Sequence, residues 1–130
     1  MHRKRTWTLA LALGAGLFTL GSAHAADAKP KYSIEEVMKA LHKGDDAIGK
    51  KVGKGNGTKE DFAKLVDYYP SLALNKPPKG DLAGWKEKCN ALTASAKALK
   101  AGEDGALERY RKAVNCKACH SEHKEDKEHK

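Results

Sequence analysis

The residues that could do the most specific chemistry lie near the C-terminus, in the pentapeptide Cys116-Lys117-Ala118-Cys119-His120. C-x-x-C-H is the attachment signature of haem c, in which each thiol adds to one vinyl group of the porphyrin. Residues three apart share one face of a helix, so both sulfur atoms can reach the same edge of the macrocycle. The histidine that follows is then placed to bind the iron. The spacing predicts one covalent haem c, with Cys116 and Cys119 as thioether partners and His120 as the proximal iron ligand.

Two other kinds of site also use closely spaced cysteines. A zinc site is conceivable with Cys89, Cys116, Cys119 and His123 as ligands, although these residues lack the paired spacing typical of such sites. A thioredoxin-like dithiol usually lies where a strand leads into a helix, and the sequence contains no convincing strand. Haem attachment is therefore the preferred interpretation, with zinc binding and dithiol chemistry as its alternatives.

Two helical stretches precede the middle of the chain. The first is predicted from the S-x-x-E capping box at Ser33 to the glycine-rich segment 53–57. The second begins at Thr58, which can cap its first turn. Apolar residues recur at helical spacing in both stretches, at Ile34, Val37, Met38, Leu41, Ile48 and Val52, and then at Phe62, Leu65, Val66, Tyr69 and Leu72.

Two more helices are predicted after the proline-containing linker 75–80. Asp81 caps the third, which Gly102 ends, and the fourth begins at Asp104. The apolar positions are Leu82, Trp85, Cys89, Leu92, Ala96 and Leu99 in the third helix, and Leu107, Tyr110, Val114 and Ala118 in the fourth. Four amphipathic helices with short connections can hide their apolar faces only against one another. The sequence therefore predicts an all-α fold, an antiparallel four-helix bundle over residues 26–122.

The first 25 residues have the features of a signal peptide. Residues 2–5 are basic, Thr8–Gly21 is apolar, and Ala23-His24-Ala25 supplies the small-x-small pattern of a cleavage site. The apolar run is shorter than the roughly 20 residues that span a membrane, so cleavage is preferred to an uncleaved anchor. We expect an exported, periplasmic protein without a stable membrane span. Loss of three basic residues lowers its formal charge from +8 to +5, and export with so modest a charge disfavours a nucleic-acid partner.

This layout resembles the cytochrome c′ and cytochrome c-556 group, whose members combine a signal peptide, four helices and a single C-x-x-C-H in the last helix. In that group a basic residue often stands one turn before the first cysteine, and Lys112 occupies that position. An aromatic and then a basic residue commonly follow three residues after the histidine. Here Lys124 matches the basic residue, whereas His123 replaces the aromatic one.

The resemblance implies that the sixth iron position decides the function. A methionine on the first helix gives low-spin iron for electron transfer in the c-556 type, whereas the c′ type leaves the iron five-coordinate and open to NO or CO. Met38 is the only methionine after residue 25, and its position matches that of the family's ligand. The alternatives are that Met38 only fills the core, or that His42 is the ligand. Met38 is preferred, because a histidine at the edge of an apolar stripe is more often a surface residue.

The third cysteine, the aromatic residues and the C-terminal tail are expected to have structural rather than chemical roles. Cys89 is expected to be a buried, small apolar residue rather than a reactive or dimer-bridging thiol. Trp85, Phe62, Tyr69 and Tyr110 are expected in the core or in the walls of the haem pocket. Residues 123–130 are too polar to pack, so His123 and His129 are predicted to be solvated in a disordered tail.

These observations combine into one prediction of function. No G-x-S-x-G, no H-E-x-x-H and no glycine-rich phosphate loop after a strand is present, so we expect no enzyme. We expect a monohaem c-type cytochrome that exchanges single electrons with redox partner proteins. The alternative is a five-coordinate c′-like protein that binds NO or CO. Dimers are frequent among c′-like proteins, so monomer and homodimer both remain open.

Overall fold

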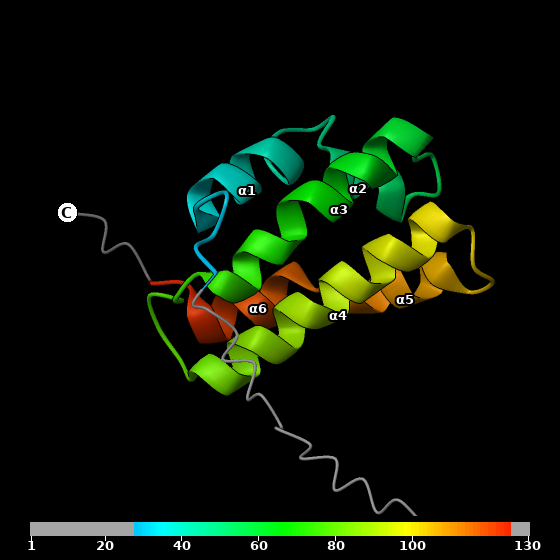
Figure 1. Cartoon of the computed structure of the whole chain (residues 1–130). Coiled ribbons are helices and arrows are strands. Elements are labelled where there is room, and N and C mark those ends of the chain that lie inside the picture. Colours follow the sequence, from blue (N-terminus) through cyan, green and yellow to red (C-terminus); the bar gives the residue numbers. More distant parts are fainter. Residues whose placement is uncertain (1–27, 126–130) are drawn as a thin grey trace, which may run out of the picture.

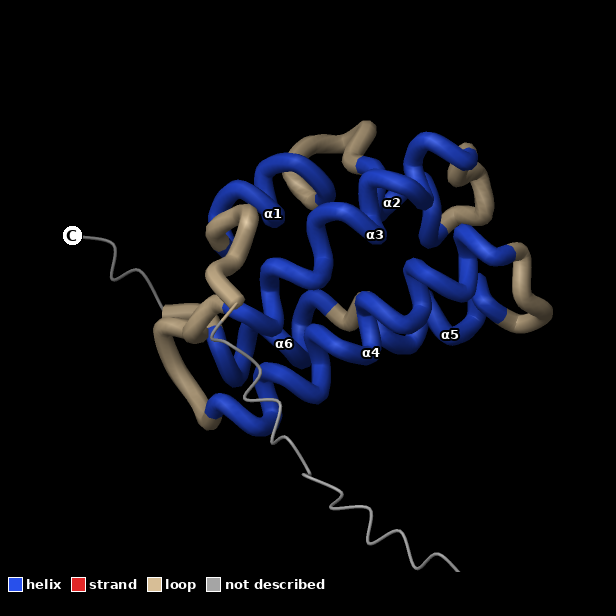
Figure 2. The backbone as a smooth tube through the Cα atoms, viewed as in Figure 1, coloured by secondary structure: helices blue, strands red, loops and turns tan. Residues whose placement is uncertain are grey.

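A computed structural model describes residues 28–125, and these residues form helices without any strand (Figures 1 and 2). The helices are α1 (Ile34–Leu41), α2 (Ile48–Gly53), α3 (Lys59–Leu74), α4 (Leu82–Ala101), α5 (Ala106–Ala113) and α6 (Cys116–His123). The all-α prediction is confirmed for this part of the chain. The predicted signal peptide lies outside the described residues. No helix among residues 28–125 is long and apolar enough to cross a membrane.

Side-chain caps set the starts of α1, α3 and α4. At α1, the Ser33 hydroxyl accepts the Glu36 amide at 3.2 Å, and the Glu36 carboxylate accepts the Ser33 amide at 2.7 Å. Thr58 and Asp61 make the same reciprocal pair at α3. Asp81 accepts the amide of Gly84 at the start of α4. Each cap satisfies amide donors that the first turn leaves free, which is why these predictions from sequence are confirmed.

The predicted first helix is interrupted. α1 ends at Leu41, and α2 begins only at Ile48. Between them Gly44 has a φ of 93°, a left-handed conformation that no α-helix can contain. The apolar residues on the two sides keep helical spacing, but the segment between them is polar apart from Ala47 and leaves the helical path.

The predicted fourth helix is also interrupted. α5 begins at Ala106 rather than Asp104, because Gly105 adopts a left-handed conformation and serves as its N-cap. α5 ends at Ala113, and Asn115 then accepts the amide of Ala118 at 3.0 Å as the cap of a new helix. The C-x-x-C-H segment therefore begins its own short helix, α6, instead of continuing α5.

Most of the predicted apolar positions meet in one core. Its buried members are Val37, Leu41, Val52, Leu65, Tyr69, Leu72, Trp85, Cys89, Ala96 and Tyr110. Leu82 is an exception, since its side chain at the first position of α4 is 46% exposed. Trp85 joins two helices, because its indole N–H donates to the Leu72 carbonyl at 2.8 Å and to the Asn75 carbonyl at 3.0 Å.

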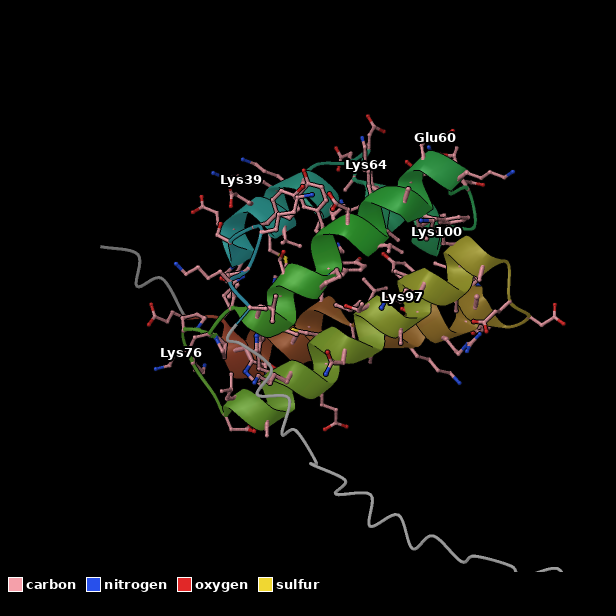
Figure 3. All side chains as sticks on the ribbon, in the orientation of Figure 1. Lys39, Glu60, Lys64, Lys76, Lys97 and Lys100 are labelled. Carbon is pink, nitrogen blue, oxygen red and sulfur yellow. The ribbon has the colours of Figure 1, made fainter. Side chains whose placement is uncertain are left out.

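The helices contact one another in a closed circuit. Figure 1 shows α3 and α4 side by side and running in opposite directions, with their most extensive contact along their lengths. α1 and α2 lie against α3, α5 and α6 lie against α4, and α2 also contacts α5. Charged side chains lie on the outer surfaces, as the labelled residues of Figure 3 illustrate, and all six of these are exposed. The circuit therefore runs through α2, α3, α4 and α5, with α1 packed on α2 and α3, and α6 packed on α4.

The position of His123 corrects the prediction of a solvated tail from residue 123. His123 is the last residue of α6, and only 2% of it is exposed. Its ring meets Trp85 edge to face, with the ring centroids 5.4 Å apart, and its Nδ1–H donates to the Lys79 carbonyl at 3.1 Å. Residues 116, 119 and 123 share a helix face, so His123 continues the inward face of the motif. Of the predicted tail, residues 124 and 125 are exposed, and residues 126–130 lie outside the described part.

We predict that Gly80→Ala lowers the free energy of unfolding more than Gly44→Ala. Both glycines have a positive φ, so either substitution should cost about 1–2 kcal/mol in backbone strain. A Cβ at Gly80 would also lie 2.6 Å from both the Glu122 carbonyl and the His123 Nδ1, whereas one at Gly44 would meet nothing within 4 Å. Urea unfolding followed by circular dichroism measures both variants. Equal losses would contradict the close packing of α6 on the linker before α4.

Candidate functional site

A cavity of about 410 Å³ lies between α1, α4 and the α5–α6 segment. The candidate iron ligands and all three cysteines line it: Met38, His42, Cys89, Cys116, Cys119 and His120. They come from α4, α6 and the C-terminal end of α1, where His42 is the C-cap, and span more than 80 positions of the chain. Leu72, Trp85, Leu92 and Val114 supply apolar parts of the wall. The structure thus brings the predicted site residues together around one mostly apolar cavity.

The two motif thiols lie at the start of α6. Cys116 is the first residue of the helix and is exposed, whereas Cys119 is half-buried and packs against the core. Burial raises the pKa of the Cys119 thiol, and the nearby Lys88 ammonium partly opposes this rise. Both cysteines line the same cavity, as their three-residue spacing on a helix predicts.

His120 lies beside Cys119 at the cavity and is exposed. No residue of the described chain hydrogen-bonds to its ring. An imidazole of this kind can offer a nitrogen lone pair to a metal without breaking an existing contact.

Met38 reaches the cavity from α1. Its side chain is half-buried and packs at the margin of the core. Its thioether therefore has access to the same space as His120, although the two residues lie on different helices. Met38 thus both packs on the core and borders the cavity.

His42 is not the surface residue that the sequence predicts. It is half-buried, and its Nε2 lies 3.1 Å from the Tyr69 hydroxyl, with the two rings stacked at 5.9 Å between centroids. The opposite edge of the ring faces Gly49, where an added Cβ would lie 2.6 Å from both Nδ1 and Cε1. Burial lowers the pKa of His42, and nearby His120 lowers it further. His42 borders the cavity, but α2 and α3 hold the two nitrogen-bearing edges of its ring.

Cys89 is buried, as predicted, with 2% of the residue exposed. It lines the cavity from α4 and is the third thiol there. Burial raises its pKa to about 12, with Cys119 adding to the rise. This thiol is therefore neutral at ordinary pH and behaves as a small apolar residue.

The zinc alternative receives no support from this geometry. Within residues 28–125, no three His, Cys, Asp or Glu side chains form a group that could hold a metal ion. His123, the fourth ligand of that alternative, packs instead on Trp85 and Lys79.

Reasoning from the sequence missed the hydrogen bonds that the hydroxyls of Tyr69 and Tyr110 make in the core. Both were expected as core or pocket-wall residues, and both are fully buried. Their hydroxyls lie 3.0 Å apart, and the Tyr110 hydroxyl also donates to the Gly49 carbonyl at 3.3 Å. The sequence contained one signal for these bonds. Both positions on the apolar stripes are tyrosine rather than phenylalanine, and a buried hydroxyl needs a hydrogen-bond partner.

Comparison with known proteins identifies no relative. No protein-family model, curated protein or solved structure matches this chain. The function must therefore be argued from the site itself.

We predict that Cys89 in the native protein reacts with iodoacetamide at pH 7.5 at least about a hundredfold more slowly than in urea. The thiolate is the reactive form, and a pKa near 12 in place of the ordinary value of about 8.5 leaves very little of it. The native rate should still rise between pH 8 and pH 10, because the folded thiol titrates only above that range. Peptide mass spectrometry measures the modification, and a rate that levels off near pH 9 would contradict the assignment.

Proposed function

We propose that this chain is an exported monohaem c-type cytochrome that transfers single electrons and resembles the cytochrome c-556 type. One observation carries the proposal: the residues of the C-x-x-C-H motif line the same cavity as Met38, the only methionine after residue 25. A chance motif on a surface helix would have no reason to face such a cavity.

The residues around the cavity fit a haem group. A porphyrin needs apolar walls, and Leu72, Trp85 and Leu92 provide them. The exposed Cys116 and half-buried Cys119 stand on one wall of the cavity, where thiols can reach one edge of a macrocycle. His120 adds an imidazole without a hydrogen-bond partner among the described residues. The donor set is that of haem c rather than of a bare metal ion.

Each residue of the site would have a distinct role. Cys116 and Cys119 would hold the haem through thioether bonds, His120 would bind its iron, and Met38 would bind the iron from α1. The haem, when bound, supplies an iron that cycles between the ferric and ferrous states. The apolar wall would cover much of the group, and the helices would keep both ligands in place, so that little rearrangement would accompany electron transfer.

The contacts of His42 support Met38 as the distal ligand. Nε2 of His42 is engaged by Tyr69, and Nδ1 lies against Gly49. Met38 has no such competing polar contact, since its sulfur needs none. Binding of iron by His42 would require breaking this partly buried hydrogen bond and would leave the buried Tyr69 hydroxyl with one partner fewer.

The proposal includes the finer architecture and the location of the protein. We infer that α1 with α2, and α5 with α6, are the two interrupted arms of an antiparallel four-helix bundle. The closed circuit of helix contacts supports this inference. The signal-peptide pattern of residues 1–25 supports export to the periplasm, where redox proteins would be the partners.

The decisive experiment is the visible spectrum of the mature protein, produced together with the haem-attachment machinery. We expect a low-spin ferric spectrum with a weak red sulfur-to-iron band, and complete loss of that band in Met38→Ala. Ile34→Ala is the matched control, because Ile34 is half-buried on the same helix but does not line the cavity. A high-spin protein that binds CO readily before any mutation would instead favour the five-coordinate, gas-binding alternative.

Covalent attachment is tested separately. We predict that the haem of the wild-type protein stays with the chain after denaturation, and that a double variant, Cys116→Ser with Cys119→Ser, retains none. Cys89→Ser should keep all of its haem, since Cys89 lies outside the motif. Haem staining of denaturing gels measures the three proteins. A wild-type chain without covalent haem would overturn the proposed function.

A further inference from the structure

A buried chain of hydrogen bonds ends on His42. The Tyr110 hydroxyl donates to the Gly49 carbonyl, which can only accept. Each hydroxyl has one proton, so all three contacts are hydrogen bonds together only when Tyr69 donates to Tyr110 across their 3.0 Å contact. In that arrangement His42 donates its Nε2–H to the Tyr69 oxygen at 3.1 Å. In the reverse arrangement Nε2 accepts the Tyr69 proton, so Nε2 is engaged by Tyr69 in either case.

Either direction leaves Nε2 of His42 without a free lone pair for a metal. A nitrogen that donates carries a proton, a nitrogen that accepts has its lone pair engaged, and this one points to a hydroxyl in the core. Nδ1 has a lone pair, but that edge of the ring faces Gly49 too closely for even a methyl group to fit between them. Tyr69 and Tyr110 are both fully buried, so water does not compete for the bond between their hydroxyls, whereas the bond to His42 is partly buried.

His42 is otherwise well placed to be a ligand. It follows Met38 by four residues, its backbone N–H donates to the Met38 carbonyl at 2.9 Å, and it lines the same cavity. An imidazole released from Tyr69 would offer a nitrogen donor at the same end of α1 as Met38. A haem with two histidine ligands would remain low-spin but would have a lower potential than one with methionine and histidine.

We infer that the Tyr69 hydroxyl selects the distal ligand of the iron, by holding His42 in the core so that Met38 completes the coordination. Tyr69 is thus a positioning residue that acts through His42 and does not touch the iron. This inference rests on the proposed function, because it presupposes a haem in the cavity.

The test removes one oxygen atom. Tyr69→Phe keeps the ring in the core but frees Nε2 of His42. We expect the variant to stay low-spin, to lose the red sulfur-to-iron band completely, and to have a lower midpoint potential. A double variant, Tyr69→Phe with His42→Phe, should recover the band, because the competing imidazole is then absent. Optical spectroscopy, electron paramagnetic resonance and redox titration supply the readouts.

Tyr68→Phe is the matched control. Tyr68 is on the same helix, but its ring stacks on Tyr32 at 4.0 Å and lies outside the hydrogen-bond chain. The visible spectrum and the midpoint potential of Tyr68→Phe should equal those of the wild type. Gly49→Ala is a second route to the same effect if Tyr69→Phe loads poorly, because the added methyl displaces the His42 ring while both tyrosine hydroxyls remain.

The outcomes separate this inference from the proposed function. A wild-type protein with the sulfur-to-iron band, together with a Tyr69→Phe variant that keeps it, would overturn the role of Tyr69 and leave the proposed function intact. A high-spin Tyr69→Phe variant would also overturn that role, since His42 would then not replace Met38. A wild-type chain without haem would overturn both proposals.

Discussion

The packing of His123 against Trp85 is the contact on which the site depends. Trp85 is anchored by two carbonyls, those of Leu72 and Asn75, and so belongs to both α3 and α4. His123 lies against its ring and reaches the Lys79 carbonyl, which ties the end of α6 to the linker before α4. An isolated helix of eight residues is marginal in water, so α6 needs such contacts to exist at all. The direction of the C-x-x-C-H segment follows from this anchor.

The helix breaks at residues 42–47 and 114–115 also help to form the cavity. Straight helices of the predicted length would pack along one another throughout, as α3 and α4 do. Because of these breaks, α1 is a separate helix from α2, and α6 is a separate helix from α5. A cavity of about 410 Å³ lies between α1, α4 and the α5–α6 segment. The walls of this cavity are mostly apolar, and a covalently held group seated there would cover them, which agrees with the proposed function.

Polar groups in the core are arranged so that few remain unpaired. The Tyr110, Tyr69 and His42 side chains satisfy one another and the Gly49 carbonyl in a single chain. Such buried networks specify one arrangement, because any shift leaves a polar atom without a partner. Among the described residues, the buried side-chain nitrogen without a hydrogen-bond partner is Nε2 of His123. The Glu122 carboxylate is 3.6 Å from this atom, so a protonated His123 would have a charge partner there.

The amino-acid sequence by itself determined the features that depend on neighbouring residues. Capping at Ser33, Thr58 and Asp81, the left-handed end of α4 at Gly102, and the shared face of Cys116 and Cys119 all arise from contacts three or four residues apart. Hydrophobic spacing also placed most of the core correctly. These predictions were confirmed because the physics behind them is local.

Only the tertiary structure decided the rest, since the deciding partners are remote in the sequence. The Tyr69 hydroxyl that holds His42 is 27 residues away, and the Lys79 carbonyl that buries His123 is 44 residues away. A histidine at a helix edge is solvated or buried according to whether such a partner meets it, and periodicity does not contain that information. Periodicity also failed to predict the helix breaks, because the apolar residues keep helical spacing on both sides although the backbone turns between them. The motif was therefore recognisable in the sequence, whereas the contact between Tyr69 and His42 became visible only in the fold.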